Sequence, residues 1–215
     1  MKVLVIGEGG REHALVWKLI NDSMKPEVYC APGNAGTDGI AVNIPISSGD
    51  IPGLLKWAKQ NKPDLTVVGP EAPLCAGITD KFTSEGFRVF GPSAAGAQIE
   101  GSKVFSKDVL VAGGVPTAEC GNFKDAAKAI EYIRSKGAPI VVKADGLAAG
   151  KGVYVCAKVE EAEKSVKEVM VSRIFGEAGA SVIVEECLEG EEASILALVD
   201  GSNVVILASA QDHKR

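Results

Sequence analysis

The stretch KVLVIGEGGREHALVWKL, residues 2–19, joins an apolar run, a glycine-rich turn and the start of a helical pattern. The run of Val and Leu before Gly7 is typical of a strand that is buried on both faces of a parallel sheet. After the turn, apolar residues continue from Ala14 at helical spacing. This order predicts a strand, a tight turn and a helix, which is the beginning of a βα unit.

The same pattern recurs through the first hundred residues. Short β-rich segments bounded by Pro or Gly are PEVYCA (26–31), PDLTVVG (63–69) and FRVFG (87–91). Helical segments, IPGLLKWAKQN (51–61) and ITDKFTSEG (78–86), lie between them. We therefore expect residues 1–101 to form a Rossmann-like domain, an open parallel sheet with helices on its faces.

The second half has a different pattern, for which we predict an α+β fold. One helix is expected to begin at the N-cap Asn122 and to stop at Gly137, and another covers VEEAEKSVKEVM (159–170) with Glu160–Lys164 and Glu163–Lys167 as i,i+4 pairs. Strands are expected at PIVVKAD (139–145), GVYVCA (152–157), SVIVEE (181–186), ASILALV (193–199) and NVVILAS (203–209). The last two should form a hairpin at Asp200-Gly201.

Composition narrows the class of protein. The chain has 215 residues, a net charge of -5 and a pI near 5.2, so no overall positive field would attract nucleic acid. The cysteines form no C-x-x-C pair and are odd in number, which argues against a disulfide or zinc framework; they are Cys30, Cys75, Cys120, Cys156 and Cys187. Without a signal-peptide pattern or an apolar run of bilayer length, we expect a cytoplasmic protein with no membrane partner.

Two segments suggest a ligand site. In VVKADGLAAGKGV (141–153), Lys143 and Lys151 flank a loop of Gly and Ala, whose backbone N–H groups can approach phosphate oxygens closely. The chain contains no Walker loop, and GEGGRE (7–12) does not fit the G-x-G-x-x-G fingerprint because Glu12 stands at its last position. The alternative for residues 141–153 is a flexible loop with solvated lysines. In VIVEECLEGEEAS (182–194), a strand end followed by acidic pairs suits a base edge and ribose hydroxyls, or else forms a solvated acidic turn.

The ordered motifs of the chain resemble a known family. They are VIGEGGREHAL (5–15), APGNAGT (31–37), VVGPEAPL (67–74), VFGPS (89–93), SKVFSK (102–107), VVKADGLAAGKGV (141–153), VEECLEGEEAS (184–194) and QDHKR (211–215). Together they resemble the ATP-grasp enzymes and, within them, the glycinamide ribonucleotide synthetase family of phosphoribosylamine–glycine ligases. The resemblance implies residues 102–120 as a linker and the start of the ATP-grasp fold, 121–192 as its small subdomain, and 193–215 as the start of a second, truncated subdomain.

The resemblance also implies a reaction and its residues. ATP would phosphorylate the carboxylate of glycine, and the amine of 5-phosphoribosylamine would attack the acyl phosphate. The implied ATP-binding residues are Lys103, Lys143, Gly150, Lys151, Gly152, Glu185, Glu186, Cys187, Leu188 and Glu192. The implied residues for 5-phosphoribosylamine are Gly10, Arg11, Asn34, Glu71, Asp212, Lys214 and Arg215. Magnesium ligands are expected beyond Arg215, so we expect the chain alone to be inactive.

Alternatives remain for both residues and function. A turn-holding role is the alternative for Asn34, a stiffened loop between Pro70 and Pro73 for Glu71, and a surface helix position for His13. For the protein, the alternatives are another ATP-grasp carboxylate–amine ligase or a nucleotide-binding module without catalysis.

Overall fold

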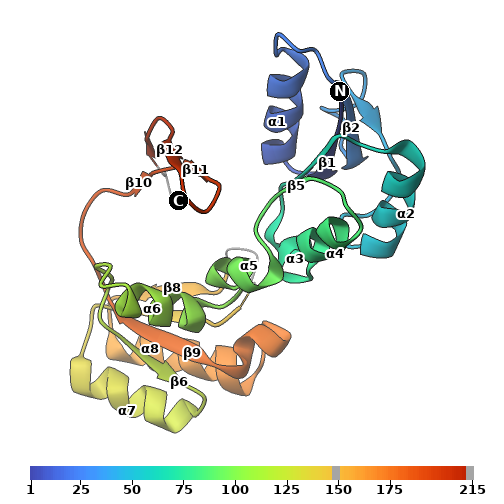
Figure 1. The fold of residues 1–215 in the computed structure, drawn as a ribbon. Helices are drawn as coiled ribbons and strands as arrows, with labels where there is room; N and C mark the ends of the chain where they lie inside the picture. The colour runs from blue at the N-terminus through green and yellow to red at the C-terminus, as the bar shows by residue number, and fades with distance from the viewer. Residues whose placement is uncertain (147–150, 212–215) are drawn as a thin grey trace.

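The computed structural model describes residues 1–146 and 151–211. Figure 1 shows a parallel-sheet part and an antiparallel-sheet part, connected through α5 (Ala94–Gly101) and α6 (Lys103–Ala112). Among the described residues, no helix has the length and apolar character needed to cross a membrane.

The first part is the open parallel sheet that the sequence predicts. Its strand order is β3-β2-β1-β4-β5, with every neighbouring pair parallel. The strands are β1 (Lys2–Gly7), β2 (Glu27–Pro32), β3 (Val42–Asn43), β4 (Leu65–Val68) and β5 (Val89–Phe90). The helices are α1 (Gly10–Ile20), α2 (Ile51–Asn61), α3 (Glu71–Cys75) and α4 (Ile78–Ser84).

The alternation of side chains along β1 explains why helices cover both faces of this sheet. Val3 and Val5 pack with Val16 of α1 on one face. Leu4 and Ile6 belong to the cluster on the other face, which includes side chains of α2 and α4. Successive strand side chains point to opposite faces, so a continuous apolar run needs a helix layer on each side.

The second part is an antiparallel sheet of order β6-β9-β7-β8. Its strands are β6 (Cys120–Phe123), β7 (Ile140–Ala144), β8 (Val153–Cys156) and β9 (Val182–Glu186). The helices α7 (Ala126–Lys136) and α8 (Val159–Val166) bury apolar residues against one of its faces. A π-helical turn (Lys167–Val171) and a 3₁₀ turn (Gly176–Ala180) follow α8.

The last segment pairs with itself rather than with this sheet. Strands β11 (Ala197–Val199) and β12 (Val204–Ile206) form the hairpin predicted at Asp200-Gly201, while β10 (Ala193–Ser194) pairs with β13 (Ala210–Gln211). Figure 1 shows this segment extending away from the antiparallel sheet. The five strands predicted for the second half therefore divide between separate sheets, because each strand is placed by its partner and not by its own pattern.

The prediction for the start of the first helix in the second half is wrong. Asn122 is not an N-cap, because residues 120–123 pair with β9 and extend the sheet through Phe123. Asp125 caps α7 instead, its Oδ1 accepting hydrogen bonds from the N–H groups of Ala127 and Lys128. Residues 103–112, within the segment 102–120 predicted as a linker and the start of the ATP-grasp fold, form helix α6. The division of the whole chain into domains stays a prediction.

The predicted i,i+4 ion pairs of the second helix are also replaced. Glu163 pairs with Arg134 of the neighbouring helix α7 at 2.6 Å, and Lys164 pairs with Glu168 at 3.7 Å. Glu163 and Lys164 therefore have partners other than the predicted ones, and the α-helix gives way to a π-helical turn at Lys167.

Candidate functional site

The pleat of β7 and β9 presents charged side chains on the face opposite to α7 and α8. Val142 and Val184 point into the core with those helices. Val141 lies opposite Glu185 in the strand register, so Lys143, two residues along, shares a face with Glu185. The Lys143 Nζ donates to Glu185 Oε2 at 2.6 Å.

Helix α6 brings two further lysines to this face, because Lys103 and Lys107 lie one turn apart on it. The Lys107 Nζ lies 3.4 Å from Glu185 Oε1, so each oxygen of this buried carboxylate faces a different ammonium group. The Lys103 Nζ donates to the carbonyl of Gly146 at 2.9 Å, next to the predicted phosphate loop. The structure therefore brings together Lys103, Lys143 and Glu185 from the predicted set.

Asp145, two residues after Lys143, connects the N-terminus of α6 to the antiparallel sheet. Its Oδ1 accepts from the Ser102 hydroxyl at 3.1 Å and from the Val104 N–H at 3.3 Å, at the N-terminus of α6. Its Oδ2 accepts from the Ser181 hydroxyl at 3.3 Å. A carboxylate at a helix N-terminus is favoured by the unpaired N–H groups there, so Asp145 joins the SKVFSK segment to the end of β7.

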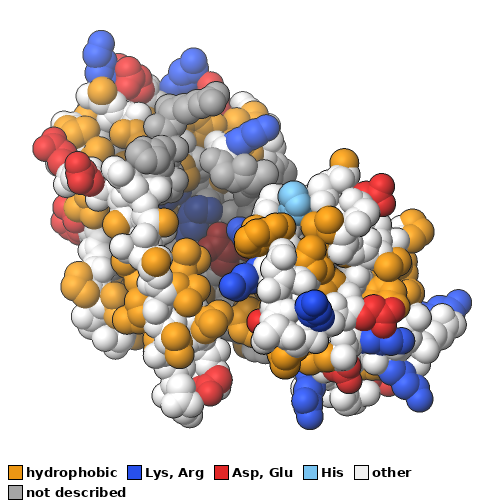
Figure 2. Space-filling model, turned by 90° about the horizontal axis from the view of Figure 1, so that it is seen from above, with side chains coloured by type: hydrophobic (Ala, Val, Ile, Leu, Met, Phe, Trp, Pro, Cys, Tyr) orange, Lys and Arg blue, Asp and Glu red, His pale blue; other side chains and the backbone are white. Residues whose placement is uncertain are grey.

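The three lysines and Glu185 lie on a cavity of about 230 Å³. Its lining residues are Ile99, Glu100, Lys103, Ser106, Lys107, Leu110, Lys143 and Glu185. Its three lysines face two carboxylates, leaving an excess of positive charge. Figure 2 shows basic and acidic side chains gathered in a hollow of the molecular surface. A small, partly enclosed site with excess positive charge suits an anionic ligand, because the surrounding protein screens the charges less than bulk water does.

The remaining described residues that were predicted to bind the nucleotide are not among those that line this cavity. Lys151 is exposed, Gly152 is buried and accepts from the Ala144 N–H at 2.8 Å, and Gly150 lies outside the described residues. Glu186 ends β9, and its side chain accepts from the Glu119 N–H at 2.8 Å.

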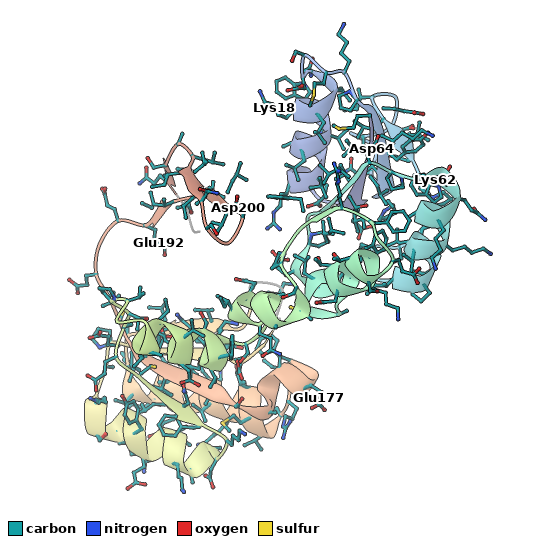
Figure 3. All side chains as sticks on the ribbon, in the orientation of Figure 1. Lys18, Lys62, Asp64, Glu177, Glu192 and Asp200 are labelled. Carbon is teal, nitrogen blue, oxygen red and sulfur yellow. The ribbon has the colours of Figure 1, made fainter. Side chains whose placement is uncertain are left out.

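The segment after β9 leaves the sheet. Cys187 is half-buried and the Leu188 side chain is exposed. Figure 3 shows Glu192 on the extended segment before β10, separated from the antiparallel sheet. The structure therefore does not bring Glu192 together with Lys143.

The predicted substrate residues of the first part gather where β1, β2 and β4 end. The guanidinium of Arg11 donates to the Gly69 carbonyl at 2.7 Å and to Glu71 Oε1 at 3.1 Å. Gly10 begins α1 and is exposed. The pKa of the Glu71 carboxyl is lowered, mainly by a hydrogen bond from the backbone N–H of Glu71 and then by the hydrogen bond from Arg11. Partial burial of the carboxyl opposes this shift. Asp212, Lys214 and Arg215 lie outside the described residues.

Asn34 joins the same edge but uses its side chain locally. Its Nδ2 donates to the carbonyl of Glu8 at 2.8 Å, and its Oδ1 accepts from the N–H groups of Gly36 and Thr37. The amide therefore ties the APGNAGT turn to the turn after β1, which agrees with the turn-holding alternative. The His13 side chain is half-buried on α1.

Glu12 gives the turn after β1 its shape. This residue is 4% exposed, and its Oε2 accepts from the Gly9 N–H at 2.7 Å. A Cβ on Gly7 or Gly69 would overlap the Glu12 side chain, so both glycines leave room for it. The residue that excluded the G-x-G-x-x-G pattern therefore fills the space between the ends of β1 and β4.

Sequence reasoning did not assign Lys107, Asp145 or Glu12 to the site. Lys107 is part of the SKVFSK motif, and its four-residue spacing from Lys103 is the signal that could have indicated it. Among residues 1–146 and 151–211, no group of three or more His, Cys, Asp or Glu side chains could hold a metal ion.

Two family models together match the whole chain. The family model of the phosphoribosylglycinamide synthetase N domain matches residues 1–100, and that of the ATP-grasp (A) domain matches residues 101–215. The phosphoribosylamine–glycine ligase of Escherichia coli is 53% identical over 217 aligned residues, which cover 100% of this chain and 51% of the relative.

Solved structures with a similar fold include a member of the same family. The crystal structure of the Thermotoga maritima phosphoribosylamine–glycine ligase is 32% identical with a TM-score of 0.81, covering 100% of this chain and 51% of that one. The biotin carboxylase–β,γ-ATP complex of Campylobacter jejuni is 16% identical with a TM-score of 0.73, covering 95% and 49%, and shares the fold. The chain spans about half the length of the curated relatives that it matches. It belongs to the phosphoribosylglycinamide synthetase family.

Proposed function

We propose that the full-length protein is an ATP-dependent ligase that joins glycine to 5-phosphoribosylamine through a glycyl phosphate intermediate. Family membership supports this function, and the observation that carries it is the cavity where Lys103 and Lys143 supply excess positive charge. A phosphate chain needs cationic and N–H donors already in place where charge is transferred.

The cavity and its surroundings would hold ATP. The ammonium groups of Lys103 and Lys143 contact the phosphates, and the loop of Gly150, Lys151 and Gly152 closes over them. The backbone of residues 185–188, which continues from β9, meets the adenine, and the Glu192 carboxylate accepts from the ribose hydroxyls. The closeness of Lys103 to Gly146 supports this arrangement, because it joins a phosphate-binding cation to the beginning of the loop.

The edge formed by β1, β2 and β4 would hold 5-phosphoribosylamine. Gly10, Arg11, Asn34 and Glu71 contribute from the described part of the chain, and Asp212, Lys214 and Arg215 contribute from its last residues. The exposed N-terminus of α1 and the guanidinium of Arg11 support an anion site here. Glu71 pairs with Arg11 and keeps the Arg11 guanidinium oriented along the edge formed by β1, β2 and β4.

The chemistry proceeds in two displacements. A carboxylate oxygen of glycine attacks the γ-phosphorus of ATP, the bond to the β-phosphate oxygen breaks, and ADP leaves. The amine of 5-phosphoribosylamine then attacks the acyl carbon, the C–O bond to phosphate breaks, and the amine loses a proton. Glycinamide ribonucleotide and phosphate are the products. The lysines stabilise the charge on the transferred phosphoryl group, and a closed loop keeps water from the acyl phosphate.

We further propose that Mg²⁺ assists phosphoryl transfer and is held by residues beyond Arg215. The described residues offer no ligand cluster for it, so we assign no step to this chain through the metal. A cytoplasmic location is proposed from the cysteines, which are free in the structure as a reducing compartment would keep them.

ADP release by the full-length protein tests the function. With MgATP and glycine, release should depend on 5-phosphoribosylamine, because the second displacement completes the turnover. Release that is equally fast with another amine would favour a different carboxylate–amine ligase of this fold. Binding of ATP without ADP release under any of these conditions would favour a nucleotide-binding module.

The ribose contact has its own test. Glu192→Gln should weaken ATP binding by about tenfold, because a charge-assisted hydrogen bond is lost, and should affect the 2′,3′-dideoxy analogue much less. Equal weakening for both nucleotides would remove Glu192 from the ribose.

A further inference from the structure

The side chain of Lys107 is fully engaged inside the protein. The residue is 8% exposed, and its Nζ donates to the Thr117 hydroxyl at 2.6 Å and to the Ala118 carbonyl at 3.0 Å. The Glu185 Oε1 lies 3.4 Å from the same nitrogen. Thr117 and Ala118 accept two of the three protons of this ammonium group, and Glu185 Oε1 neutralises its charge at ion-pair distance. Lys107 lines the cavity, but its ammonium group is already held by these three partners.

Lys143 differs from Lys107 in what it leaves available. Its side chain is 27% exposed, and among the described residues the structure gives Nζ one partner, Glu185 Oε2 at 2.6 Å. Two protons of this ammonium group remain for a ligand in the cavity. Both lysines act on one carboxylate that is 5% exposed.

A buried carboxylate with a single lysine partner would hold that lysine tightly, because separating the pair leaves an uncompensated charge. With Lys107 on its other oxygen, Glu185 stays paired when Lys143 turns toward an anion. We propose that Lys107 is a positioning residue: it neutralises Glu185 and thereby leaves Lys143 free to bind the phosphates. This inference rests on the proposed function, in which the cavity holds a nucleotide.

The test uses the full-length protein and compares ADP with adenosine by isothermal titration calorimetry. Lys107→Gln keeps a hydrogen-bond donor but removes the charge, so Glu185 should hold Lys143 and ADP affinity should fall about tenfold. Adenosine, which has no phosphate, should bind within about twofold of the wild type. Equal weakening of both ligands would show general damage to the site and would overturn the proposal.

A second substitution separates positioning from packing. In Lys107→Gln/Glu185→Gln no carboxylate competes for Lys143, so ADP affinity should recover most of the loss. In Lys107→Arg the charge stays, and ADP affinity should remain close to the wild type. Failure of the double variant to recover overturns the proposal. Lys59→Gln serves as the matched control, because Lys59 pairs with Glu85 and lies on α2 of the parallel-sheet part. This variant should bind ADP as the wild type does.

The double-mutant cycle covers the case in which Lys107→Gln alone is too unstable to assay. If Lys107 acts through Glu185, its replacement in the Glu185→Gln background should leave ADP affinity within about twofold of Glu185→Gln alone. A larger loss would overturn the proposal. A wild-type protein that does not bind ADP would refute the proposed function and this inference together, whereas normal wild-type binding with an unchanged Lys107→Gln variant refutes this inference alone.

Discussion

Replacement of Lys143 should weaken nucleotide binding while leaving the fold nearly intact. The ammonium group reaches the cavity from β7, and its loss removes a charge-assisted hydrogen bond to a phosphate, which is worth about 1.5–3 kcal/mol. Lys143→Ala in the full-length protein should therefore raise the Kd for ADP by roughly ten- to 150-fold.

The expected effect on folding follows from the partners that remain. In Lys143→Ala the Glu185 carboxylate keeps Lys107, so no buried charge is left without a counter-ion. Since the Lys143 side chain is 27% exposed, solvent screens the lost pair and the cost should be about 1 kcal/mol. Glu185→Ala instead strands the buried Lys107 ammonium and should cost about 3–5 kcal/mol.

Titration calorimetry with ADP and denaturant unfolding of the same preparations would measure both quantities. Lys164→Ala removes a lysine that pairs with Glu168 on the outside of α8, and it should change neither quantity by much. An unchanged Kd for Lys143→Ala would refute the phosphate assignment. A loss of stability as large as that of Glu185→Ala would refute the reasoning about the shared carboxylate.

Three further predictions concern the parallel-sheet part. Gly69→Ala should destabilise the protein by about 1–3 kcal/mol, because the new Cβ overlaps the buried Glu12 side chain, and thermal unfolding of Gly69→Ala/Glu12→Ala should show partial relief. Because the pKa of Glu71 is lowered in the folded protein, the ionised carboxylate stabilises the fold at pH values above 4.5, its ordinary pKa, and this stabilisation is lost as the pH falls through the lowered pKa. The Tm difference between wild type and Glu71→Gln should therefore be larger at pH 7 than at pH 3. Burial raises the pKa of the Cys30 thiol to about 11, so mass spectrometry after iodoacetamide at pH 8 should find Cys30 unmodified in the folded protein and modified in urea.

The local pattern of the sequence was sufficient for the elements with strong apolar or turn signals. The apolar run before Gly7 forms the buried central strand β1, and Asp200-Gly201 forms the turn between β11 and β12. The lysines 103 and 143 were identified by resemblance, and they lie on one cavity. These features depend on residues close together in the chain, where periodicity and turn chemistry act.

Features that depend on distant pairing could not be predicted in the same way. Asn122 and Asp125 are both good N-caps, and the pairing of residues 120–123 with β9 decides between them. The contact of Lys143 with Glu185 joins residues that are 42 positions apart, and it exists because the register places Val141 opposite Glu185. Glu12 has a charged side chain that the pattern places in solvent, but glycines at the ends of two strands give it a buried position.

The same long-range pairing explains how a carboxylate can lie beside the proposed phosphate site. Glu185 would repel an anionic ligand if it stood alone, and with one lysine it would leave the pair neutral. Two lysines on its two oxygens are the smallest set that neutralises the buried carboxylate and still leaves a positive charge facing the cavity. Lys103 then adds its charge at the beginning of the loop. The two lysines of SKVFSK thus have different tasks, one toward the loop and one toward Glu185, although the sequence presents them as equivalent positions on one helix face.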